Sequence, residues 1–205
     1  MSRSAVCISR AAGAGGEEVA KLVAEQLGFR YVDNEIVQRA AELAGVSPEQ
    51  VAQVEHSQPL VSRILEALAT VPAASEVGYV AAAIPSPSMT YSHLIEHAVR
   101  ETADEKNVVI VAHGASHALG GRPEVLRVFV TASLASRAAR LSRESGIDEK
   151  AATKSVEVSD KERARYLERF YNVRHELPVH YDLTLNTDLV TPETAAALVV
   201  AAARA

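Results

Sequence analysis

The chain contains 205 residues, 48% of them hydrophobic, which is enough to bury one sizeable core and calls for no second domain. Aromatic residues make up only 4% and Trp is absent, so the core must consist of Ala, Val, Leu and Ile, as suits helices packed on a parallel sheet. The formal net charge of -5 provides no general attraction to nucleic acids or anionic membranes, and neither is expected as a partner.

The start of the sequence predicts strands that alternate with helices. Residues 5–9 are an apolar run typical of a short buried strand, and a glycine-rich stretch links them to a helical pattern that ends at Gly28. Residues 29–32 predict a second strand, after which Asp33 or Asn34 caps another helix. This part of the chain therefore has the order strand, helix, strand, helix.

The middle of the sequence is less regular. Residues 45–87 contain short helical patterns interrupted by prolines and predict a helical segment. A helix at residues 91–105 then leads to the fully apolar run at residues 108–111, which is typical of a central parallel strand. The sheet is expected to resume there.

The last part of the sequence again alternates. Residues 125–130 predict a strand, and Thr131 or Ser133 caps the helical, strongly charged stretch that follows as far as residue 170. Residues 182–186 predict a final strand and residues 192–203 a closing helix. Five strand candidates separated by helices predict an α/β fold with a mostly parallel sheet covered on both faces.

The glycine-rich stretch at residues 10–16 joins the first strand to the first helix. Such a loop is a ready phosphate site, because backbone N–H groups and the helix dipole point at the anion. In the full Walker motif a lysine and a Ser or Thr follow, and those two places hold Gly16 and Glu17 here. By pattern alone two interpretations stay open: a phosphate site, or a tight turn without a ligand.

Residues 8–16 resemble the opening of the cytidylate kinase-like family, which has an Ile-Ser-Arg start and a Gly-Ser-Gly-Gly type loop. Residues 20–33 are similar to the family's first helix and second strand, residues 160–171 to its lid helix and residues 181–187 to its last strand. The resemblance implies a single domain over residues 1–205 with the three-layer fold of P-loop nucleoside monophosphate kinases. It also implies an acceptor-binding helical segment at about 45–90 and a lid region at about 134–172.

The reaction that the resemblance implies is phosphoryl transfer from ATP, with Mg²⁺, to CMP or dCMP. The residues expected to bind the ATP phosphates are Arg10, Gly13, Ala14, Gly15, Gly16, Glu17 and Glu18. The expected catalytic arginines are Arg137, Arg140 and Arg163. The residues expected to bind the acceptor are Asp33, Arg39, His113 and Asp160.

A structural alternative stands beside several of these assignments. Arg137 and Arg140, one helical turn apart, also suit a solvated helix face, and Asp160 with Arg163 suits a simple surface ion pair. Asp33 is equally suited to capping a helix. No spacing of histidines argues for a metal site, and none is expected.

Two positions depart from the family pattern. Glu17 places a carboxylate at the helix start, where it suits the helix dipole but repels a phosphate. After the central strand the family usually has Gly-Arg-Gly, whereas this chain has His113 between an alanine and a glycine. A fixed cation has thus become a titratable imidazole.

Three functional hypotheses follow. The first is an active nucleoside monophosphate kinase, and the second is a degenerate relative that binds a nucleotide or another phosphorylated ligand without turnover. The third is an interaction protein that forms a homodimer through apolar residues of the middle segment, namely Leu60, Ile64, Leu65 and Leu68.

Two further expectations concern location and the single thiol. The start of the chain shows no signal-type segment and the sequence has no apolar run long enough to span a bilayer, so a cytoplasmic location is expected. The only cysteine, Cys7, lies inside the first apolar run and is expected to be a buried, unreactive side chain.

Overall fold

The structure is a computed structural model that describes residues 3–44, 87–111 and 114–205. It divides into two compact units, Met1–Asp33 with Thr102–Ala205, and Asn34–Glu101. The larger unit contains the sheet and is the one that carries the site described below.

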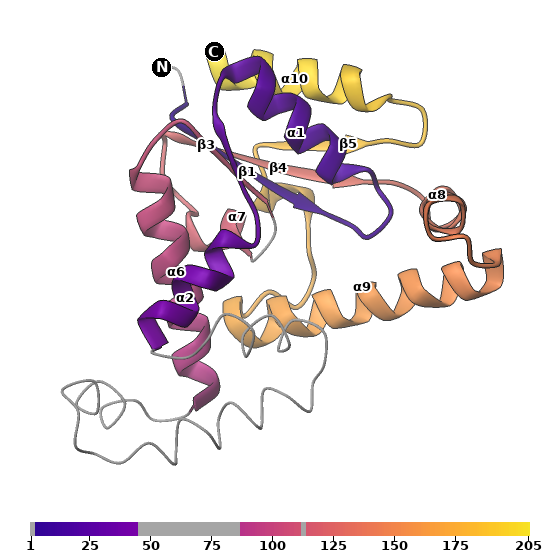
Figure 1. Ribbon diagram of the computed structural model, residues 1–205, viewed down its shortest axis with the longest axis horizontal. Helices are drawn as coiled ribbons and strands as arrows, with labels where there is room; N and C mark the ends of the chain where they lie inside the picture. Colours follow the sequence, from indigo (N-terminus) through magenta and orange to yellow (C-terminus); the bar gives the residue numbers. More distant parts are fainter. Residues whose placement is uncertain (1–2, 45–86, 112–113) are drawn as a thin grey trace. The chain divides into compact units, whose positions relative to one another are not determined.

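The larger unit is built on a five-stranded sheet in the order β2-β3-β1-β4-β5, shown in Figure 1. All four pairings are parallel, which confirms the predicted α/β class. The strands are β1 (Ala5–Arg10), β2 (Arg30–Val32), β3 (Val108–Val111), β4 (Val125–Thr131) and β5 (Leu183–Asn186). Because the strands are parallel, their carboxyl ends meet at one edge, where open α/β sheets bind ligands.

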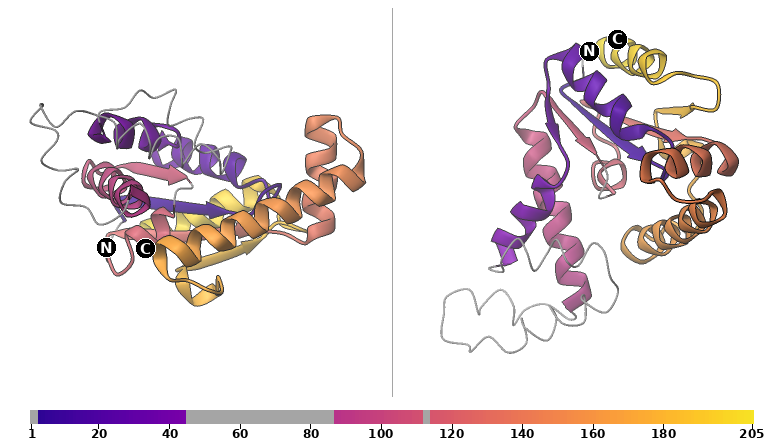
Figure 2. Two further views of the ribbon diagram at one scale, coloured as in Figure 1. Left: turned by 90° about the horizontal axis from the view of Figure 1, so that it is seen from below. Right: turned by 45° about the vertical axis from the view of Figure 1, so that its right-hand side comes forward.

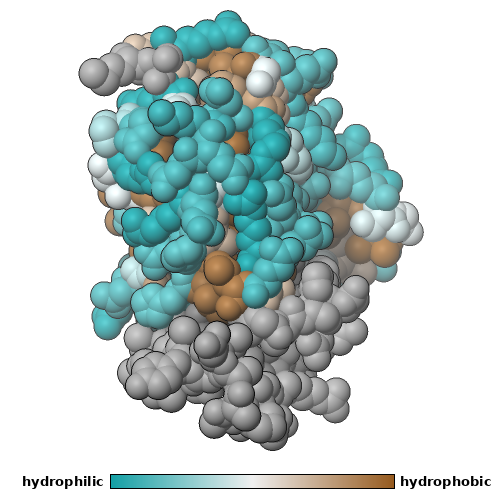
Figure 3. Space-filling view, turned by 60° about the vertical axis from the view of Figure 1, so that its left-hand side comes forward, coloured by the Kyte–Doolittle hydropathy of each residue, from teal (hydrophilic) through white to brown (hydrophobic). Residues whose placement is uncertain are grey.

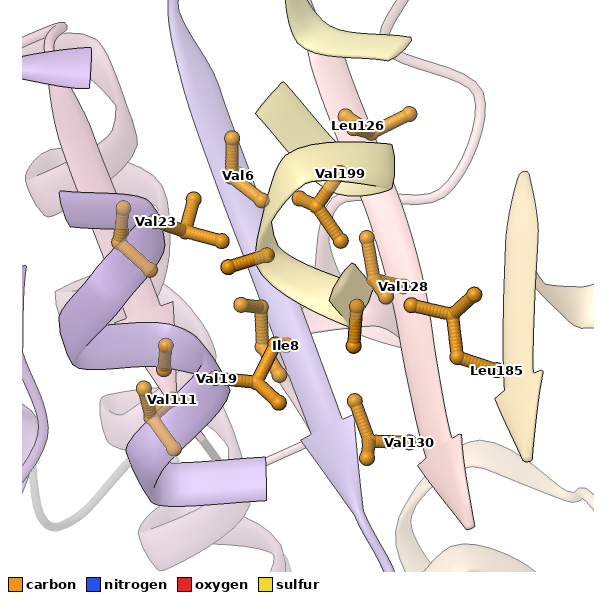
Figure 4. Close-up of a cluster of buried hydrophobic side chains, with 14 of the residues drawn as sticks. Val6, Ile8, Val19, Val23, Val111, Leu126, Val128, Val130, Leu185 and Val199 are labelled. Atoms are coloured by element: carbon orange, nitrogen blue, oxygen red, sulfur yellow. The ribbon is translucent and has the colours of Figure 1, made fainter. Parts of the chain in front are cut away.

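One face of the sheet is covered by α1 (Gly16–Leu27) and α10 (Pro192–Arg204). Figure 4 shows Val19 of α1 and Val199 of α10 over Ile8 of β1 and Val128 of β4. All four side chains are fully buried or nearly so, and the small residues of α10 let the helix approach the strands closely. The predicted core of aliphatic side chains between helices and a parallel sheet is confirmed.

The opposite face carries the short helix α7 (Ala115–Ala118), which follows β3. The hydroxyl oxygens of Ser9 in β1 and Ser116 in α7 are 3.0 Å apart and buried, so they share a hydrogen bond across this face. Cys7 is fully buried, and burial raises its pKa to about 12 because the thiolate loses its hydration. The prediction of a buried, unreactive cysteine is confirmed.

The charged stretch after β4 forms two helices, α8 (Leu134–Ser145) and α9 (Glu149–Tyr171). Ser133 caps α8 by accepting a hydrogen bond from the Ser136 N–H, and Gly146 ends it in the left-handed conformation. Asp148 then caps α9 through the Ala151 N–H. Figure 2 shows the two helices, in orange, beyond the carboxyl ends of β1 and β4, with their axes at a wide angle to each other. A one-turn helix, η1 (Pro178–His180), precedes β5.

The smaller unit contains α2 (Glu35–Ala44) and most of α6 (Pro87–Asp104) among the described residues. α6 begins at Pro87, four residues before the helix start expected from the sequence. The rest of the expected acceptor-binding segment and the four residues of the expected dimer surface lie outside the described residues.

The described surface in Figure 3 is mostly hydrophilic. None of the helices searched in the described ranges is long and apolar enough to cross a membrane.

Candidate functional site

The glycine-rich loop runs from the end of β1 to the first residue of α1, and two of its glycines are required by geometry. Gly13 and Gly15 have φ values of 74° and 72°, a region that residues with a Cβ rarely adopt. A Cβ on Gly13 would also lie 2.6 Å from the carbonyl oxygen of Arg137, whereas nothing lies within 4 Å of a Cβ on Gly15. Gly13 thus allows α8 to approach the loop, and Gly15 borders open space.

The amide groups at the start of α1 are not used by the helix itself. The first helical hydrogen bond runs from the Val19 N–H to the Gly15 carbonyl, and no side chain caps the helix. The N–H groups of Gly16, Glu17 and Glu18 therefore have no acceptor among the described residues. Free amides at a helix N-terminus, next to glycines, form an anion-binding site.

Glu17, the residue that departs from the expected pattern, is paired. Its Oε1 accepts a hydrogen bond from Nη2 of Arg10, the last residue of β1. The Glu17 side chain is 52% exposed, so the carboxylate lies at the edge of the site. The repulsion that this carboxylate would exert on a bound phosphate is thereby reduced by a neighbouring cation.

Arg137 of α8 binds the loop from the other side. It is only 7% exposed, and its Nη1 donates to the carbonyl oxygen of Ala12 at 3.3 Å, while its Nε donates to Ala132 at 3.1 Å. The description of Arg137 as part of a solvated helix face is therefore wrong. Its guanidinium is fixed against the backbone of the loop.

Arg140, one turn further along α8, contacts the next residue of the loop, Gly13, and also Thr187. Its Nη1 lies 3.4 Å from the Gly13 carbonyl and 2.9 Å from the hydroxyl of Thr187, and its Nη2 donates to the Thr187 carbonyl. The Thr187 hydroxyl donates in turn to the Ala14 carbonyl at 2.8 Å. Three successive carbonyls of the loop are thus held by α8 and by Thr187, which directly follows β5.

A pocket of about 210 Å³ lies beside the loop, between β4, α9 and the segment after α9. Asp160 and Arg163, three residues apart on α9, both line it, as does Arg137. Asp160 binds Arg137 through two hydrogen bonds of 2.8 Å, and Arg163 pairs with Glu176. Among the described residues, Asp160 and Arg163 therefore do not form the simple ion pair considered as their alternative.

Arg163 belongs to a half-buried network at the floor of this pocket. Its Nε donates to Glu176 at 2.8 Å, its guanidinium lies 5.5 Å from the centre of the Phe129 ring, and Tyr181 donates its hydroxyl to Glu176. Although burial alone lowers the pKa of Arg163, its hydrogen bond to Glu176 raises it. Burial raises the pKa of Glu176 by itself, but the bonds from Arg163 and Tyr181 bring it below its usual value. Both groups are therefore charged at neutral pH.

His117 of α7 lies next to this network, with Nε2 3.5 Å from the Tyr181 hydroxyl. Its ring packs 5.4 Å from that of Tyr171 and 5.6 Å from that of His180. Burial lowers the pKa of His117 to about 4, although the charge of Glu176 acts in the opposite direction. The imidazole is thus neutral at physiological pH.

The remaining predicted residues lie in different parts of the chain. Asp33, at the end of β2, accepts a hydrogen bond of 3.4 Å from the Tyr31 hydroxyl. Arg39 lies in the smaller unit, where it binds Glu35 one turn earlier at 2.9 Å. His113 lies outside the described residues. The acceptor-binding roles of these residues stay predictions.

The sequence analysis did not assign Glu176 or Thr187 to the site, and it used Tyr181 only as part of the resemblance to the family's last strand. Their chemistry offered no signal, since a single carboxylate or hydroxyl near the end of a chain has many uses. In the described ranges no group of three or more His, Cys, Asp or Glu side chains could hold a metal ion.

Comparisons with known proteins show the family and the fold of the chain. The model of the cytidylate kinase-like family matches residues 5–189. No curated protein matches the sequence.

Three solved structures cover nearly the whole chain. An uncharacterized protein from Eubacterium ventriosum ATCC 27560 has a TM-score of 0.67, is 18% identical and aligns over 98% of both chains. TT1252 from Thermus thermophilus has a TM-score of 0.53, is 16% identical and aligns over 99% of this chain and 98% of its own. A shikimate kinase from Bacteroides thetaiotaomicron has a TM-score of 0.50, is 15% identical and aligns over 95% of both. The fold is thus that of P-loop kinases.

Proposed function

This chain belongs to the cytidylate kinase-like family, and from that premise we propose that it is an ATP-dependent nucleoside monophosphate kinase that transfers a phosphoryl group to CMP or dCMP. The observation that carries the proposal is the unoccupied row of amides at the start of α1, next to a pocket lined by arginines. Phosphoryl transfer needs phosphates held in line and cations around the migrating group rather than covalent chemistry by the protein.

The donor phosphates would bind at the loop. The amides of Gly16, Glu17 and Glu18 would hold oxygens of ATP, and the open space at Gly15 leaves room for them. Mg²⁺ would enter with the phosphates as part of the substrate. Arg137 and Arg140 keep the carbonyls of the loop occupied, so that the loop presents amides rather than carbonyls to an anion.

The acceptor would bind in the adjoining pocket. Arg163 and Arg137 line it, and so does Arg174, which lies 3.9 Å from the carboxylate of Glu168. A phosphate monoester carries two negative charges and would replace carboxylates as the partner of these guanidinium groups. Asp160, which also lines the pocket, offers an acceptor for the amino group of a cytosine base. This choice of base comes from the family alone.

The second candidate function is nucleotide binding without turnover. It is favoured by the pairing of two of the three pocket arginines with partly buried carboxylates, Arg137 with Asp160 and Arg163 with Glu176. A cation that stays bound to a carboxylate contributes less to a transition state in which negative charge is redistributed. Turnover requires that a closing motion exchange these partners for phosphate.

The decisive experiment is ADP release from ATP and Mg²⁺ with each nucleoside monophosphate in turn. Gly15→Asp is the inactivating variant, since it adds a carboxylate at a site where a side chain has room and where Asp tolerates the positive φ. Gly15→Asn, which has the same shape without the charge, is the matched control. Turnover on CMP or dCMP that Gly15→Asp abolishes and Gly15→Asn retains in part supports the proposal.

Two other results would overturn all or part of this proposal. An ATP-dependent increase in melting temperature without ADP release for any acceptor would support the binding protein. Turnover on a different acceptor, with none on CMP or dCMP, would keep the kinase but replace its substrate.

A further inference from the structure

Arg10 and Gly16 compete for the same space. A Cβ built on Gly16 would lie 2.5 Å from Cβ of Arg10 and 3.2 Å from its Cδ. The φ of Gly16 is not positive, so its backbone accepts other residues and the contact with Arg10 is what requires glycine. Because position 16 is the place of the Walker lysine, a lysine there and an arginine at position 10 exclude each other.

The guanidinium of Arg10 is only partly satisfied. Its Nη2 donates to Glu17, but its Nε is buried and has no acceptor among the described residues. A buried donor without an acceptor costs free energy, so the guanidinium gains from a shift of the side chain that brings this donor to an oxygen of an anion bound at the start of α1. Glu17 is half exposed, so its carboxylate is able to turn into water when a stronger anion arrives.

The surroundings of Arg10 are acidic on the side of β2. Burial raises the pKa of Tyr31 to about 12, the carboxylates of Asp33 and Glu17 add to this increase, and Arg10 opposes it. Arg10 therefore lies close enough to influence groups at the carboxyl ends of both β1 and β2. Its charge is present before any ligand binds and is oriented by its stem, which packs on the first turn of α1.

We infer that Arg10 supplies the phosphate-binding cation that the Walker lysine supplies in other P-loop proteins, and that Glu17 holds Arg10 in place until nucleotide phosphates displace it. The phosphate-binding cation thus lies on Arg10, the last residue of β1, instead of on the first residue of α1. This inference rests on the proposed function, because it requires that the loop bind ATP.

The first test measures binding of ATP with Mg²⁺ by calorimetry. Arg10→Ala should weaken binding about tenfold or more, the loss expected for a charge-assisted hydrogen bond to phosphate, and Arg10→Lys should keep part of the affinity. Glu17→Gln should strengthen binding, since it removes the competing carboxylate. Arg30→Ala, which removes another arginine paired at the surface of the same unit, is the matched control and should leave binding unchanged.

The opposite changes in ATP affinity expected for Arg10→Ala and Glu17→Gln distinguish a binding role of the pair from a structural role. If the Arg10–Glu17 pair only stabilises the fold, Arg10→Ala and Glu17→Gln should both lower the melting temperature and neither should change the affinity for ATP. That result would overturn the inference while leaving the proposed function intact. Failure of the unmodified protein to bind ATP would instead overturn the proposed function.

The second test places the cation at position 16, the position of the Walker lysine, instead of at position 10. Gly16→Lys alone should impair ATP binding, because its Cβ collides with that of Arg10. The double variant Arg10→Gly/Gly16→Lys removes the colliding Cβ, which an alanine would retain, and restores a lysine at the Walker position. Recovery of ATP binding in the double variant relative to Arg10→Gly is the expected result. The inference would be contradicted if the double variant melts at the same temperature as Arg10→Gly and yet binds ATP no better than Arg10→Gly does.

Discussion

Arg137 and Asp160 join α8 to α9 through two parallel hydrogen bonds, each 2.8 Å long, at the wall of the pocket beside the glycine loop. The side chain of Arg137 is 9% exposed and that of Asp160 is 42% exposed. The pair therefore couples a buried cation to a carboxylate that solvent and ligands reach. It also links the residue that braces the loop to the residue expected to contact the acceptor.

Replacing Asp160 with Asn should destabilise the protein and weaken acceptor binding. The buried guanidinium of Arg137 loses its charged partner, which costs about 1–3 kcal/mol in the free energy of unfolding. Urea denaturation measures this loss, and Glu157→Gln, a neutral change on the exposed side of α9, is the control. A KM for CMP that stays unchanged in Asp160→Asn would contradict the acceptor-binding role.

The stability of the protein should rise with pH between about 4 and 6.5 because of His117. Burial lowers the pKa of His117 to about 4 from 6.5, so in this range the unfolded chain binds a proton that the folded protein does not. The contribution is complete above pH 6.5 and is lost as the pH falls toward 4. Denaturation midpoints measured across this range should show a shallower slope in His117→Asn than in the unmodified protein. Equal slopes would show that His117 is not buried in its neutral form.

Replacing Gly13 with Ala should be far more damaging than the same change at Gly121. Both positions have a positive φ, but only at Gly13 would the new Cβ meet backbone atoms, at 2.6 Å from the Arg137 carbonyl. Gly13→Ala should therefore lower the free energy of unfolding by about 1–3 kcal/mol more than Gly121→Ala, in addition to the backbone strain that the two variants share. Thermal unfolding of the two variants compares them directly. Similar melting temperatures would show that α8 does not pack on the loop.

Thr187→Val should loosen the loop while keeping the shape of the side chain. The variant leaves the Ala14 carbonyl and one donor of Arg140 without their partner, and Thr187 is 3% exposed. The expected loss is about 1–2 kcal/mol in unfolding free energy, together with weaker ATP binding. Thr184→Val, at an exposed position of β5, is the control. If both variants bind ATP equally, the hydroxyl of Thr187 does not shape the loop.

Much of the fold was predictable because it depends on local patterns. The uninterrupted apolar run at β3 and the apolar start of β1 indicated buried parallel strands, and both were found. Gly28 indicated the end of α1, and of the two candidate caps for α8, Thr131 and Ser133, the structure selects Ser133. Gly146 was the signal that the charged stretch divides into two helices, and the sequence interpretation did not use it.

The site was less predictable because its contacts join distant parts of the chain. The resemblance to the family indicated Asp160 and Arg163, but the partners of these two residues, Arg137 and Glu176, were not foreseen. The steric conflict between Arg10 and Gly16 could not be read from the sequence either, since it depends on how the strand enters the helix. Local signals thus placed the loop, and only the tertiary structure revealed what holds it.

The hydrogen bond from Thr187 to Ala14 joins residues that are 173 positions apart. On the ribosome, Ala14 of the loop is synthesised 173 residues before Thr187, so the loop gains this bond only after β5 and Thr187 have emerged. A nascent chain that ends before β5 lacks the clamp on its loop, so nucleotide is unable to act as an early folding template through this contact. The final loop geometry is therefore acquired much later than the synthesis of the loop itself.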